Sequence, residues 1–330
     1  MKKKPTVSIT LGDLAGIGPE VTLKALANNS LVNKNNFLII GSSVRLPKYI
    51  ENIYFIQDVN DLDFSKSPIN FWNLNNIKEE QFKLGEINKY CGKASIDFIK
   101  KAVNLALKNK IQAIVTAPIS KEAIGLAGFK YFGHTDFLAA LTNTSQYAMM
   151  FASKKLKVVL VTIHTSLQKA INDLSKDKIF IAIKLVYEGL QKYFKIKKPK
   201  LAVAGLNPHA GEGGILGEEE NSKIIPAIDK ARNMGIDIYG PYPPDIVFYK
   251  AHKGEFDVVV SMYHDQGLIP LKLLAFEEAV NITLGLPIIR TSPDHGTAFD
   301  IAGKNIANPN SMINAIMLAT FMAKDKCFYT

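Results

Sequence analysis

The chain has 330 residues, 47% of them hydrophobic, and a formal net charge of +10. This length and composition exclude a disordered protein and allow one or two globular domains with a large core. No apolar stretch is long enough to cross a membrane, and the lysines are scattered apart from a short patch at residues 192–200, which argues against a nucleic-acid partner. The positive charge favours small anionic substrates instead.

The N-terminus and the cysteines indicate a cytoplasmic protein. Lys2 to Lys4 resemble the basic start of an export signal, but Gly12 and Asp13 interrupt the apolar stretch that follows. Cys91 and Cys327 lie far apart, in no spacing typical of a disulfide framework or a metal site. We therefore expect the protein in a reducing compartment.

Short β-branched runs alternate with longer amphipathic stretches along the chain. The runs predicted as strands are residues 6–10, 37–40, 113–116, 158–162, 201–204 and 257–261. Between them, residues 94–108 and 176–193 carry apolar side chains at three- and four-residue spacing, which is typical of helices packed on a sheet. This alternation predicts an α/β fold with a mostly parallel, buried sheet.

A glycine-rich turn, Gly12 to Glu20, follows the first predicted strand. It has the strand-to-helix context of a nucleotide phosphate loop, but its glycine spacing is not GxGxxG. A tight turn with Pro19 at the start of a helix explains these residues without a ligand.

Further along, residues 133–135 (Gly-His-Thr) offer backbone amides, an imidazole and a hydroxyl to an anion such as phosphate. Lys272 and Arg290 lie in apolar runs, where a cation is costly unless it meets a partner or a ligand. Each is explained equally well as a surface side chain whose stem lies along apolar surface. Asn281 is open to a capping or turn role as well as to ligand binding.

Three of the six histidines come directly after predicted strands: His164, His209 and His264. In an open α/β sheet the carboxyl ends of strands line one crevice, so these distant residues can converge. Three imidazoles that leave one coordination position open are typical of a catalytic metal site. Zinc suits imidazole well, and cobalt, manganese, nickel and magnesium remain open. Taken singly, each histidine is also explained as an ordinary loop or core residue.

The surroundings of two of these histidines favour a metal site. His209 lies in residues 207–214 (Asn-Pro-His-Ala-Gly-Glu-Gly-Gly), a rigid turn that would fix its approach to a ligand. Asp265 follows His264 and is a candidate to orient its imidazole or to act as a fourth ligand.

A family resemblance adds to this reading. Residues 295–309 (HGTAFDIAGKNIANP) resemble the adenosine-binding loop of the isocitrate and isopropylmalate dehydrogenases, as Gly16 to Glu20 resemble their N-terminal turn. Those enzymes bind a nicotinamide cofactor without the Rossmann fingerprint. Within that superfamily, residues 6–322 are similar to the 4-hydroxythreonine-4-phosphate dehydrogenase family of pyridoxal phosphate synthesis. The motifs that carry the similarity are residues 133–135, 207–214, 263–267, 281–287 and 290–298.

The resemblance implies an α/β, two-lobed isocitrate/isopropylmalate dehydrogenase-like fold, with mostly parallel sheets, flanking helices and an active site in the cleft between the lobes. It assigns a nucleotide-binding lobe to residues 1–122 and 276–330, and a metal, substrate and dimerisation lobe to residues 123–275. It also implies a homodimer whose active site is shared between chains.

The same resemblance assigns site residues. The implied metal ligands are His164, His209 and His264; the implied substrate contacts are His134, Thr135, Lys272, Asn281 and Arg290; the implied cofactor contacts are His295, Gly296, Asp300 and Asn308. The cofactor would be NAD or NADP, with one divalent ion, zinc, magnesium or cobalt, in each active site.

The implied reaction is the NAD-dependent oxidation of 4-phosphohydroxy-L-threonine to 2-amino-3-oxo-4-phosphooxybutyrate, which decarboxylates to 3-amino-2-oxopropyl phosphate. A divalent ion would promote both steps. Lys272 would assist as an acid or an electrostatic stabiliser. Asp245 and Asp265 are the candidates for the catalytic base that removes the hydroxyl proton.

Three alternatives stay open from sequence. The nearest is a dehydrogenase of a phosphorylated four-carbon sugar acid, of the 4-phosphothreonate or erythronate type. A second is a three-histidine zinc hydrolase, in which the metal would activate water; the loop at residues 295–309 argues against it. A third is a phosphoryl-ligand binding protein without catalysis.

Overall fold

The computed structural model describes residues 4–33, 35–44, 46, 53–131 and 133–324. Cys91 is a free, buried thiol, whereas Cys327 lies outside the described residues. The chain forms two compact units: residues 1–144 with 286–330, and residues 145–285. The resemblance placed the lobe boundaries between residues 122 and 123 and between residues 275 and 276. The segment carrying His134 and Thr135 belongs to the first unit, because its helix packs against the long helix of that unit.

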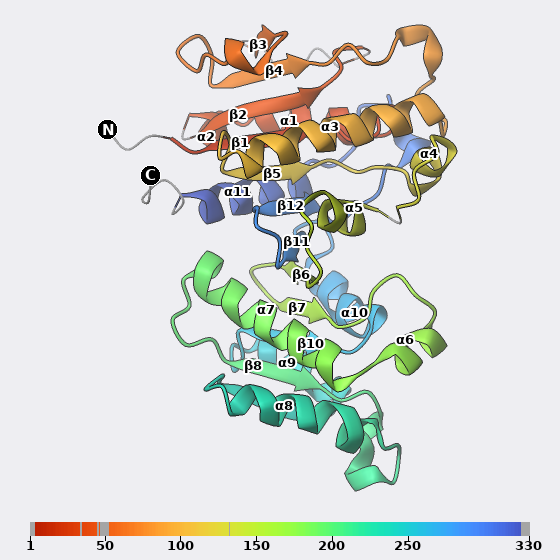
Figure 1. Ribbon diagram of the computed structural model, residues 1–330, viewed down its shortest axis with the longest axis vertical. Coiled ribbons are helices and arrows are strands. Elements are labelled where there is room, and N and C mark those ends of the chain that lie inside the picture. Colours follow the sequence, from red (N-terminus) through yellow and green to blue (C-terminus); the bar gives the residue numbers. More distant parts are fainter. Residues whose placement is uncertain (1–3, 34, 45, 47–52, 132, 325–330) are drawn as a thin grey trace. The chain divides into compact units, whose positions relative to one another are not determined.

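The first unit has a sheet of six parallel strands in the order β3-β4-β2-β1-β5-β12 (Figure 1). Their bounds are β1 Thr6–Thr10, β2 Asn36–Gly41, β3 Ile53–Ile56, β4 Ile69–Asn73, β5 Ala113–Thr116 and β12 Arg290–Pro293. The helices are α1 Gly18–Leu26, α2 Asn29–Val32, α3 Lys89–Leu107, α4 Lys121–Leu126, α5 His134–Leu141 and α11 Asn310–Ala323.

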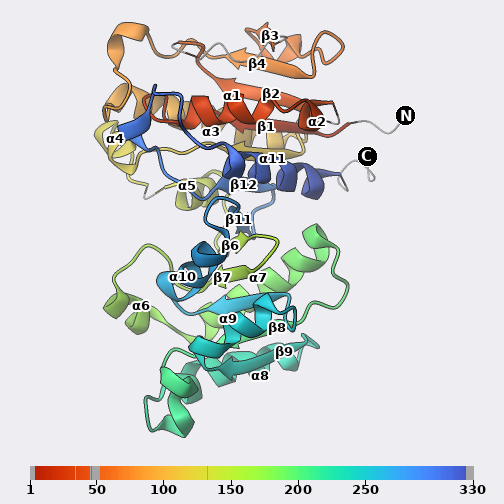
Figure 2. The same ribbon diagram turned by 180° about the vertical axis from the view of Figure 1, so that it is seen from behind.

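Helices cover both faces of this sheet. Figure 2 shows α1 and α11 over one face, and Figure 1 shows α3 over the other. The central strands β1 and β2 are therefore buried on both sides: every residue of β1 is buried, and in β2 only Asn36 is partly exposed. Helix α3 begins after Asn88, whose side chain accepts a hydrogen bond from the Tyr90 amide at 2.7 Å.

The second unit has six strands in the order β11-β6-β7-β10-β8-β9. Their bounds are β6 Ala148–Ala152, β7 Lys157–Leu160, β8 Leu201–Ala204, β9 Ile238–Tyr242, β10 Val258–Ser261 and β11 Val280–Leu284. Strand β6 is antiparallel to both of its neighbours, while β7, β10, β8 and β9 are parallel. The prediction of mostly parallel sheets is confirmed.

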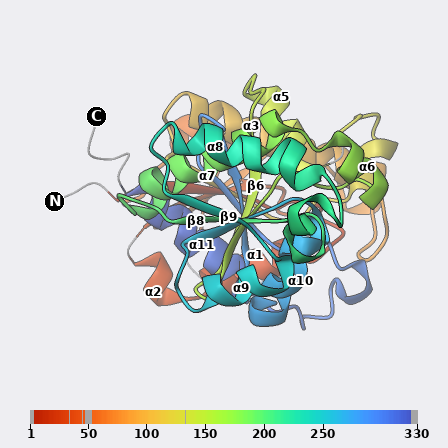
Figure 3. The same ribbon diagram turned by 90° about the horizontal axis from the view of Figure 1, so that it is seen from below.

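Five helices flank the strands of the second unit: α6 Leu167–Asp173, α7 Lys176–Phe194, α8 Ile225–Arg232, α9 Pro244–His252 and α10 His264–Ala275. Figure 3 shows α7 and α8 on one side of the strands, with α9 and α10 on the other. None of the helices in the described part of the chain combines the length and apolar character that crossing a bilayer requires.

Candidate functional site

The three candidate metal ligands follow three neighbouring strands of the second unit. Strand β10 pairs in parallel with β7 on one side and with β8 on the other. His164 comes shortly after β7, His209 shortly after β8, and His264 opens α10 behind β10. Because the carboxyl ends of parallel strands meet at the same edge of a sheet, all three histidines lie at that edge.

His164 and His264 lie together within one chain. Their ring centroids are 5.8 Å apart and their planes are tilted by 44°. The Nδ1 atom of His264 lies 2.7 Å from Oδ1 of Asp265, a contact that fixes which ring nitrogen is left for a ligand. Two adjacent imidazoles suit a divalent transition metal. Among the described residues of one chain, however, no group of three or more His, Cys, Asp or Glu side chains is arranged to hold a metal ion.

His209 lies in a segment with unusual backbone geometry. Five consecutive residues, from His209 to Gly213, have positive φ angles between 43° and 78°. Only glycine adopts this region freely, so the other three residues of the run are strained. The structure shows a turn here, and it places the His209 ring at the exposed surface.

A buried carboxylate holds the start of this turn. Oε1 of Glu220 accepts hydrogen bonds from the amides of Leu206 and Asn207 at 2.7 and 2.8 Å, and its Oε2 accepts one from the Asn207 side chain at 2.9 Å. The Asn207 side chain also donates to Glu219 at 2.8 Å, and this bond lowers the pKa of the Glu219 carboxyl. Glu220 was not predicted as a site residue, because nothing local in the sequence marks its partners.

The remaining predicted residues of the second unit are spread over three elements. Asp245 lies in the first turn of α9, directly after β9, and is exposed. Lys272 lies in the last turn of α10, eight residues beyond His264, which is about 12 Å along a helix that rises 1.5 Å per residue. Its Nζ atom lies 5.5 Å from the centroid of the Phe276 ring. Asn281 is the second residue of β11, opposite Phe151 of β6.

The first unit brings the predicted phosphate contacts together. His134 and the buried Thr135 form the first turn of α5, where free backbone amides favour an anion. Burial lowers the pKa of the His134 imidazole well below its ordinary value, and the nearby Arg290 charge lowers it further. Its Nε2 atom is buried and has no hydrogen-bond partner among the described residues. The ring is therefore neutral and beside a cation.

Arg290 is itself buried, at 2% exposure. Its Nε and Nη2 atoms donate to Oγ1 of Thr116, the last residue of β5, at 3.1 and 2.7 Å. Burial lowers the pKa of the guanidinium from 12.5 to about 9. The sequence marked Thr116 only as the end of a strand, so this contact was not foreseen.

The predicted cofactor loop, residues 295–309, also belongs to the first unit. Burial lowers the pKa of His295, whose Nδ1 atom lies 3.0 Å from the Gly296 carbonyl oxygen. Its Nε2 atom is buried without a hydrogen-bond partner in the described part of the chain. Gly296, Asp300 and Asn308 are exposed. An unpartnered ring nitrogen beside exposed polar groups fits the hydroxyl and ring atoms of a nucleotide.

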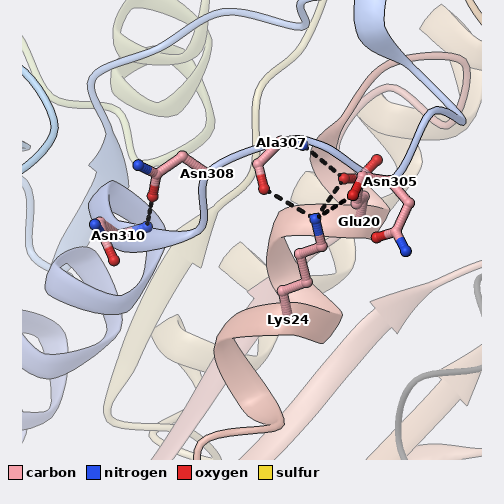
Figure 4. A network of polar contacts seen from close by, with 6 residues as sticks. All are labelled: Glu20, Lys24, Asn305, Ala307, Asn308 and Asn310. Carbon is pink, nitrogen blue, oxygen red and sulfur yellow. Dashed lines mark hydrogen bonds and ion pairs between the residues drawn. The ribbon is translucent and has the colours of Figure 1, made fainter.

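The loop rests on the turn that precedes α1. The Ile17 amide donates to the Thr297 carbonyl at 2.9 Å, and a Cβ atom on Gly16 would come within 2.7 Å of that same carbonyl oxygen. Gly16 is thus required for close approach of the loop. Helix α1 begins at Gly18 with Pro19 in its first turn, as the structural interpretation of this turn predicted. At the other end of the loop, Oδ1 of Asn308 accepts a hydrogen bond at 2.9 Å from the amide of Asn310, the first residue of α11 (Figure 4).

Comparison with known proteins gives the family. The model described as pyridoxal phosphate biosynthetic protein PdxA matches residues 33–319. A 4-hydroxythreonine-4-phosphate dehydrogenase of Sulfurihydrogenibium sp. (strain YO3AOP1) is 46% identical, with 96% of this chain and 98% of that protein covered. A D-threonate 4-phosphate dehydrogenase of Salmonella typhimurium is 44% identical, with 96% and 99% covered. Both relatives are dehydrogenases, which confirms the prediction of an oxidoreductase.

Solved structures agree. The crystal structure of 4-hydroxythreonine-4-phosphate dehydrogenase from Klebsiella pneumoniae has a TM-score of 0.87 and 41% identity, and covers 97% of this chain and 98% of that one. Isocitrate dehydrogenase from Methylococcus capsulatus shares the fold alone, at a TM-score of 0.52 and 14% identity, with 98% and 87% covered. The predicted isocitrate dehydrogenase-like α/β fold is confirmed. The chain belongs to the family of the pyridoxal phosphate biosynthetic protein PdxA.

Proposed function

We propose that the chain is a metal-dependent NAD(P) dehydrogenase that oxidises 4-phosphohydroxy-L-threonine to 2-amino-3-oxo-4-phosphooxybutyrate, which decarboxylates to 3-amino-2-oxopropyl phosphate. The observation that carries the proposal is the placement of His164, His209 and His264 behind three adjacent parallel strands. Membership of a pyridoxal phosphate biosynthetic family supports the substrate.

His134, Thr135 and Arg290 bind the substrate phosphate in this proposal. A dianionic phosphate offsets the cost of keeping the Arg290 guanidinium buried. The neutral His134 ring can donate its Nε2 proton to a phosphate oxygen, which gives the buried nitrogen a partner. The amides at the start of α5 add further donors. Together these groups fix the substrate at its phosphate end, while Asn281 and Lys272 contact the rest of it.

His164, His209 and His264 hold one divalent ion, zinc, magnesium or cobalt, with ligands drawn from both chains of a homodimer. The adjacency of His164 and His264 supports this assignment. When bound, such an ion polarises the hydroxyl and carbonyl oxygens of a substrate. Asp265 contacts Nδ1 of His264 and so presents its Nε2 as the ligand atom.

Three residues are candidates for the proton transfers of the reaction. Lys272 acts as an acid or an electrostatic stabiliser of the developing enolate. Asp245 and Asp265 are the candidates for the base that takes the hydroxyl proton. Because Asp265 is already engaged with His264, Asp245 is the freer of the two within the described residues. A kcat–pH profile of Asp245→Asn separates them: loss of the acidic limb assigns the base to Asp245, and an unchanged limb assigns it to Asp265.

NAD, or NADP, binds at the loop of His295, Gly296, Asp300 and Asn308. When bound there, the cofactor would supply the acceptor for the hydride that leaves the carbinol carbon. The unpartnered Nε2 atom of His295 supports this placement, as does the exposure of the other three residues. We also place the enzyme in the cytoplasm, which the free thiol of Cys91 supports.

An exposed apolar surface on α10 supports the homodimer proposal. Ile269, Leu273 and Phe276 are exposed by 66%, 85% and 72%, at the spacing of one helical face of α10 and its end. Apolar groups of this size at the surface mark an interface. A second copy of the chain is the proposed occupant, because the same helix carries His264 and Lys272, for which a shared active site is expected.

A phosphorylated sugar acid is the second candidate substrate. It is favoured by the D-threonate 4-phosphate dehydrogenase of Salmonella typhimurium, whose 44% identity is close to the 46% of the Sulfurihydrogenibium enzyme. The two substrates differ at the group next to the carboxylate, an amine in one and a hydroxyl in the other.

The deciding experiment follows NADH absorbance with each substrate, with and without a chelator, and after zinc, magnesium or cobalt is restored. Metal-dependent NADH formation from 4-phosphohydroxy-L-threonine supports the first proposal. Preference for D-threonate 4-phosphate moves the enzyme to sugar-acid oxidation. No NADH with either substrate, in protein that holds metal, contradicts both and returns the zinc hydrolase to consideration.

A further inference from the structure

Helix α1 is attached to both ends of the predicted cofactor loop. The backbone before the helix contacts the start of the loop, through the Ile17 amide and the Thr297 carbonyl. The body of the helix contacts the end of the loop, through Glu20 and Lys24 (Figure 4). The second attachment uses side chains, so it can be changed without altering the backbone turn.

Glu20 and Lys24 together bind three backbone groups of the loop. Nζ of Lys24 lies 2.8 Å from Oε1 of Glu20, and it donates to the carbonyl oxygens of Asn305 and Ala307, each at 3.0 Å. Oε1 of Glu20 also accepts a hydrogen bond from the Ala307 amide at 2.8 Å. Both backbone polar groups of Ala307 are therefore bound to α1, and all three protons of the lysine ammonium have an acceptor.

The environment of this pair sets it apart from an ordinary helix-surface pair. The Glu20 side chain is 5% exposed and that of Lys24 is 23% exposed. Desolvating two charges is costly unless further hydrogen bonds compensate, and here those bonds go to the loop. By contrast, Lys184 and Glu188 form a pair with the same spacing on α7, at 3.8 Å and with 43% and 56% exposure.

The segment that Glu20 and Lys24 bind contains a residue with an unfavourable backbone conformation. Asn305 has a φ of 58° and Gly303 a φ of 79°, so the chain turns in left-handed conformations just before Ala307. Ala307 is buried, whereas Ile306 beside it is 65% exposed. The position of Asn308, the last predicted cofactor contact, follows directly from where Ala307 is fixed.

We propose that Glu20 and Lys24 are positioning residues for the nicotinamide cofactor: by binding the backbone of residues 305–307 they preorganise the loop and so set its affinity for NAD(P). This rests on the proposed function of the loop. Preorganisation lowers the entropy that a ligand must remove on binding. The pair should thus act on cofactor binding, with little effect on the chemical step.

The test compares wild-type enzyme with Lys24→Met, Lys24→Arg and Glu20→Gln. The dissociation constants of NADH and NADPH are measured by calorimetry, together with kcat, the KM for cofactor and the KM for substrate. We expect Lys24→Met to raise the cofactor dissociation constant about tenfold and to leave kcat at saturating cofactor within about twofold. Lys24→Arg should restore most of the affinity, and Glu20→Gln should have a smaller effect because it keeps an acceptor oxygen.

Lys184→Met is the matched control, since it breaks an ion pair of the same spacing on a helix surface. Amide hydrogen exchange of residues 303–310 is a second readout that needs no cofactor. The proposal expects faster exchange of the Ala307 amide in Lys24→Met and no change there in Lys184→Met.

The outcomes separate the inference from its premise. Wild-type protein that binds neither NADH nor NADPH removes the proposed function of the loop, and the inference with it. Wild-type protein that binds cofactor, beside Lys24 and Glu20 variants with unaltered affinity, overturns the inference alone. If Lys24→Met does not fold, Lys24→Arg and Glu20→Gln decide, and unaltered affinity in both overturns it. Faster exchange without weaker binding also overturns it, because the pair would then be structural only.

Discussion

The Arg290 guanidinium places two donors on a single oxygen, Oγ1 of Thr116, at 3.1 and 2.7 Å. The two residues end and begin neighbouring parallel strands, β5 and β12. Thr116 is fully buried, so water cannot take over its role. The hydroxyl therefore helps to orient the guanidinium that the proposal assigns to the substrate phosphate.

Thr116→Val should separate the effect of the orientation of the Arg290 guanidinium from the effect of its charge. The substitution keeps the shape of the side chain and removes the acceptor of two hydrogen bonds from Arg290, and we expect it to cost about 1–3 kcal/mol of folding free energy. We expect the KM for the phosphorylated substrate to rise about tenfold, the equivalent of roughly 1.4 kcal/mol. Steady-state kinetics with urea unfolding measure both effects.

Thr291→Val is the control for that experiment. The Thr291 hydroxyl is buried on β12 next to Arg290 and donates to the Ala315 carbonyl at 2.8 Å. Its loss should lower stability and leave the substrate KM unchanged. An equal rise of KM in both variants would show that general loosening of the strand, and not the orientation of Arg290, is responsible.

His134 makes stability depend on pH. Burial, and then the Arg290 charge, hold the folded-state pKa of this imidazole well below its ordinary value of 6.5. The unfolded chain therefore takes up a proton first as the pH falls, and the folded state loses stability from about pH 6.5 downward. Above that pH the imidazole is neutral in both states and has no such effect.

His134→Gln should weaken this dependence. We expect the difference in unfolding free energy between variant and wild type to shift in favour of the variant below pH 6.5, at up to about 1.4 kcal/mol per pH unit. Urea unfolding between pH 5 and 8 measures it, with exposed His252→Gln as the control. Parallel pH curves for wild type and His134→Gln would contradict a depressed pKa at His134.

The predicted strands were short runs rich in β-branched residues, and they appear as β1, β2, β5, β7, β8 and β10. Other strands were not predicted: β6 (Ala-Met-Met-Phe-Ala), for example, is apolar throughout but contains no β-branched residue. Strand β12, Arg-Thr-Ser-Pro, is fully buried although it is polar. Its threonine is satisfied by a carbonyl of α11, a contact between separate elements that hydrophobic patterning does not reveal.

The candidate site, too, was predicted only in part from the sequence. The placement of histidines behind strands followed from α/β topology alone, and the structure shows the three strands to be neighbours. Asp265 was predicted to orient His264, and the two side chains are in contact, but the residues that orient Arg290 and hold the cofactor loop were not found. Thr116 is 174 positions from Arg290, and Lys24 is 281 positions from Asn305. Such pairs depend on the packing of the whole unit, whereas the Glu20–Lys24 spacing is visible in sequence but gives no hint of the loop it binds.

Glu220 should control metal affinity without being a ligand. Its carboxylate holds Leu206 and Asn207 at the start of the strained turn that carries His209. Glu220→Ala removes these bonds, and we expect metal affinity to fall about 10- to 100-fold, as for other residues that orient ligands. Competition with a zinc-sensitive dye measures the metal affinity. His209→Ala should lose bound metal and turnover but keep the fold, so it gives the lower limit of metal affinity in this assay.

Glu219→Ala is the matched control, because Glu219 accepts from the same asparagine side chain but contacts neither amide in the bonds described. It should lose less than about threefold in affinity, or under roughly 0.7 kcal/mol. Metal affinity unchanged in Glu220→Ala would mean that the turn keeps its geometry without the carboxylate. A fully active, metal-free His209→Ala enzyme would remove the metal assignment itself.

The exposed apolar face of α10 is the proposed dimer interface. Leu273, at 85% exposure, is the most exposed of its three apolar residues. Leu273→Glu places a charge in the proposed interface, and we expect the dimer dissociation constant to rise at least about 100-fold, the equivalent of roughly 2.8 kcal/mol. Light scattering coupled to size-exclusion chromatography, over a range of protein concentrations, measures the shift from dimer to monomer.

Activity in the same samples tests whether the site is shared. If metal ligands come from two chains, turnover per chain falls with the monomer fraction and returns at high protein concentration. Met234→Glu, at a residue with 58% exposure in the turn after α8, controls for adding a surface charge to the second unit. A Leu273→Glu protein that stays dimeric contradicts the assignment of this face. A monomer with full metal and full turnover contradicts the shared site and leaves His164, His209 and His264 to hold the ion within one chain.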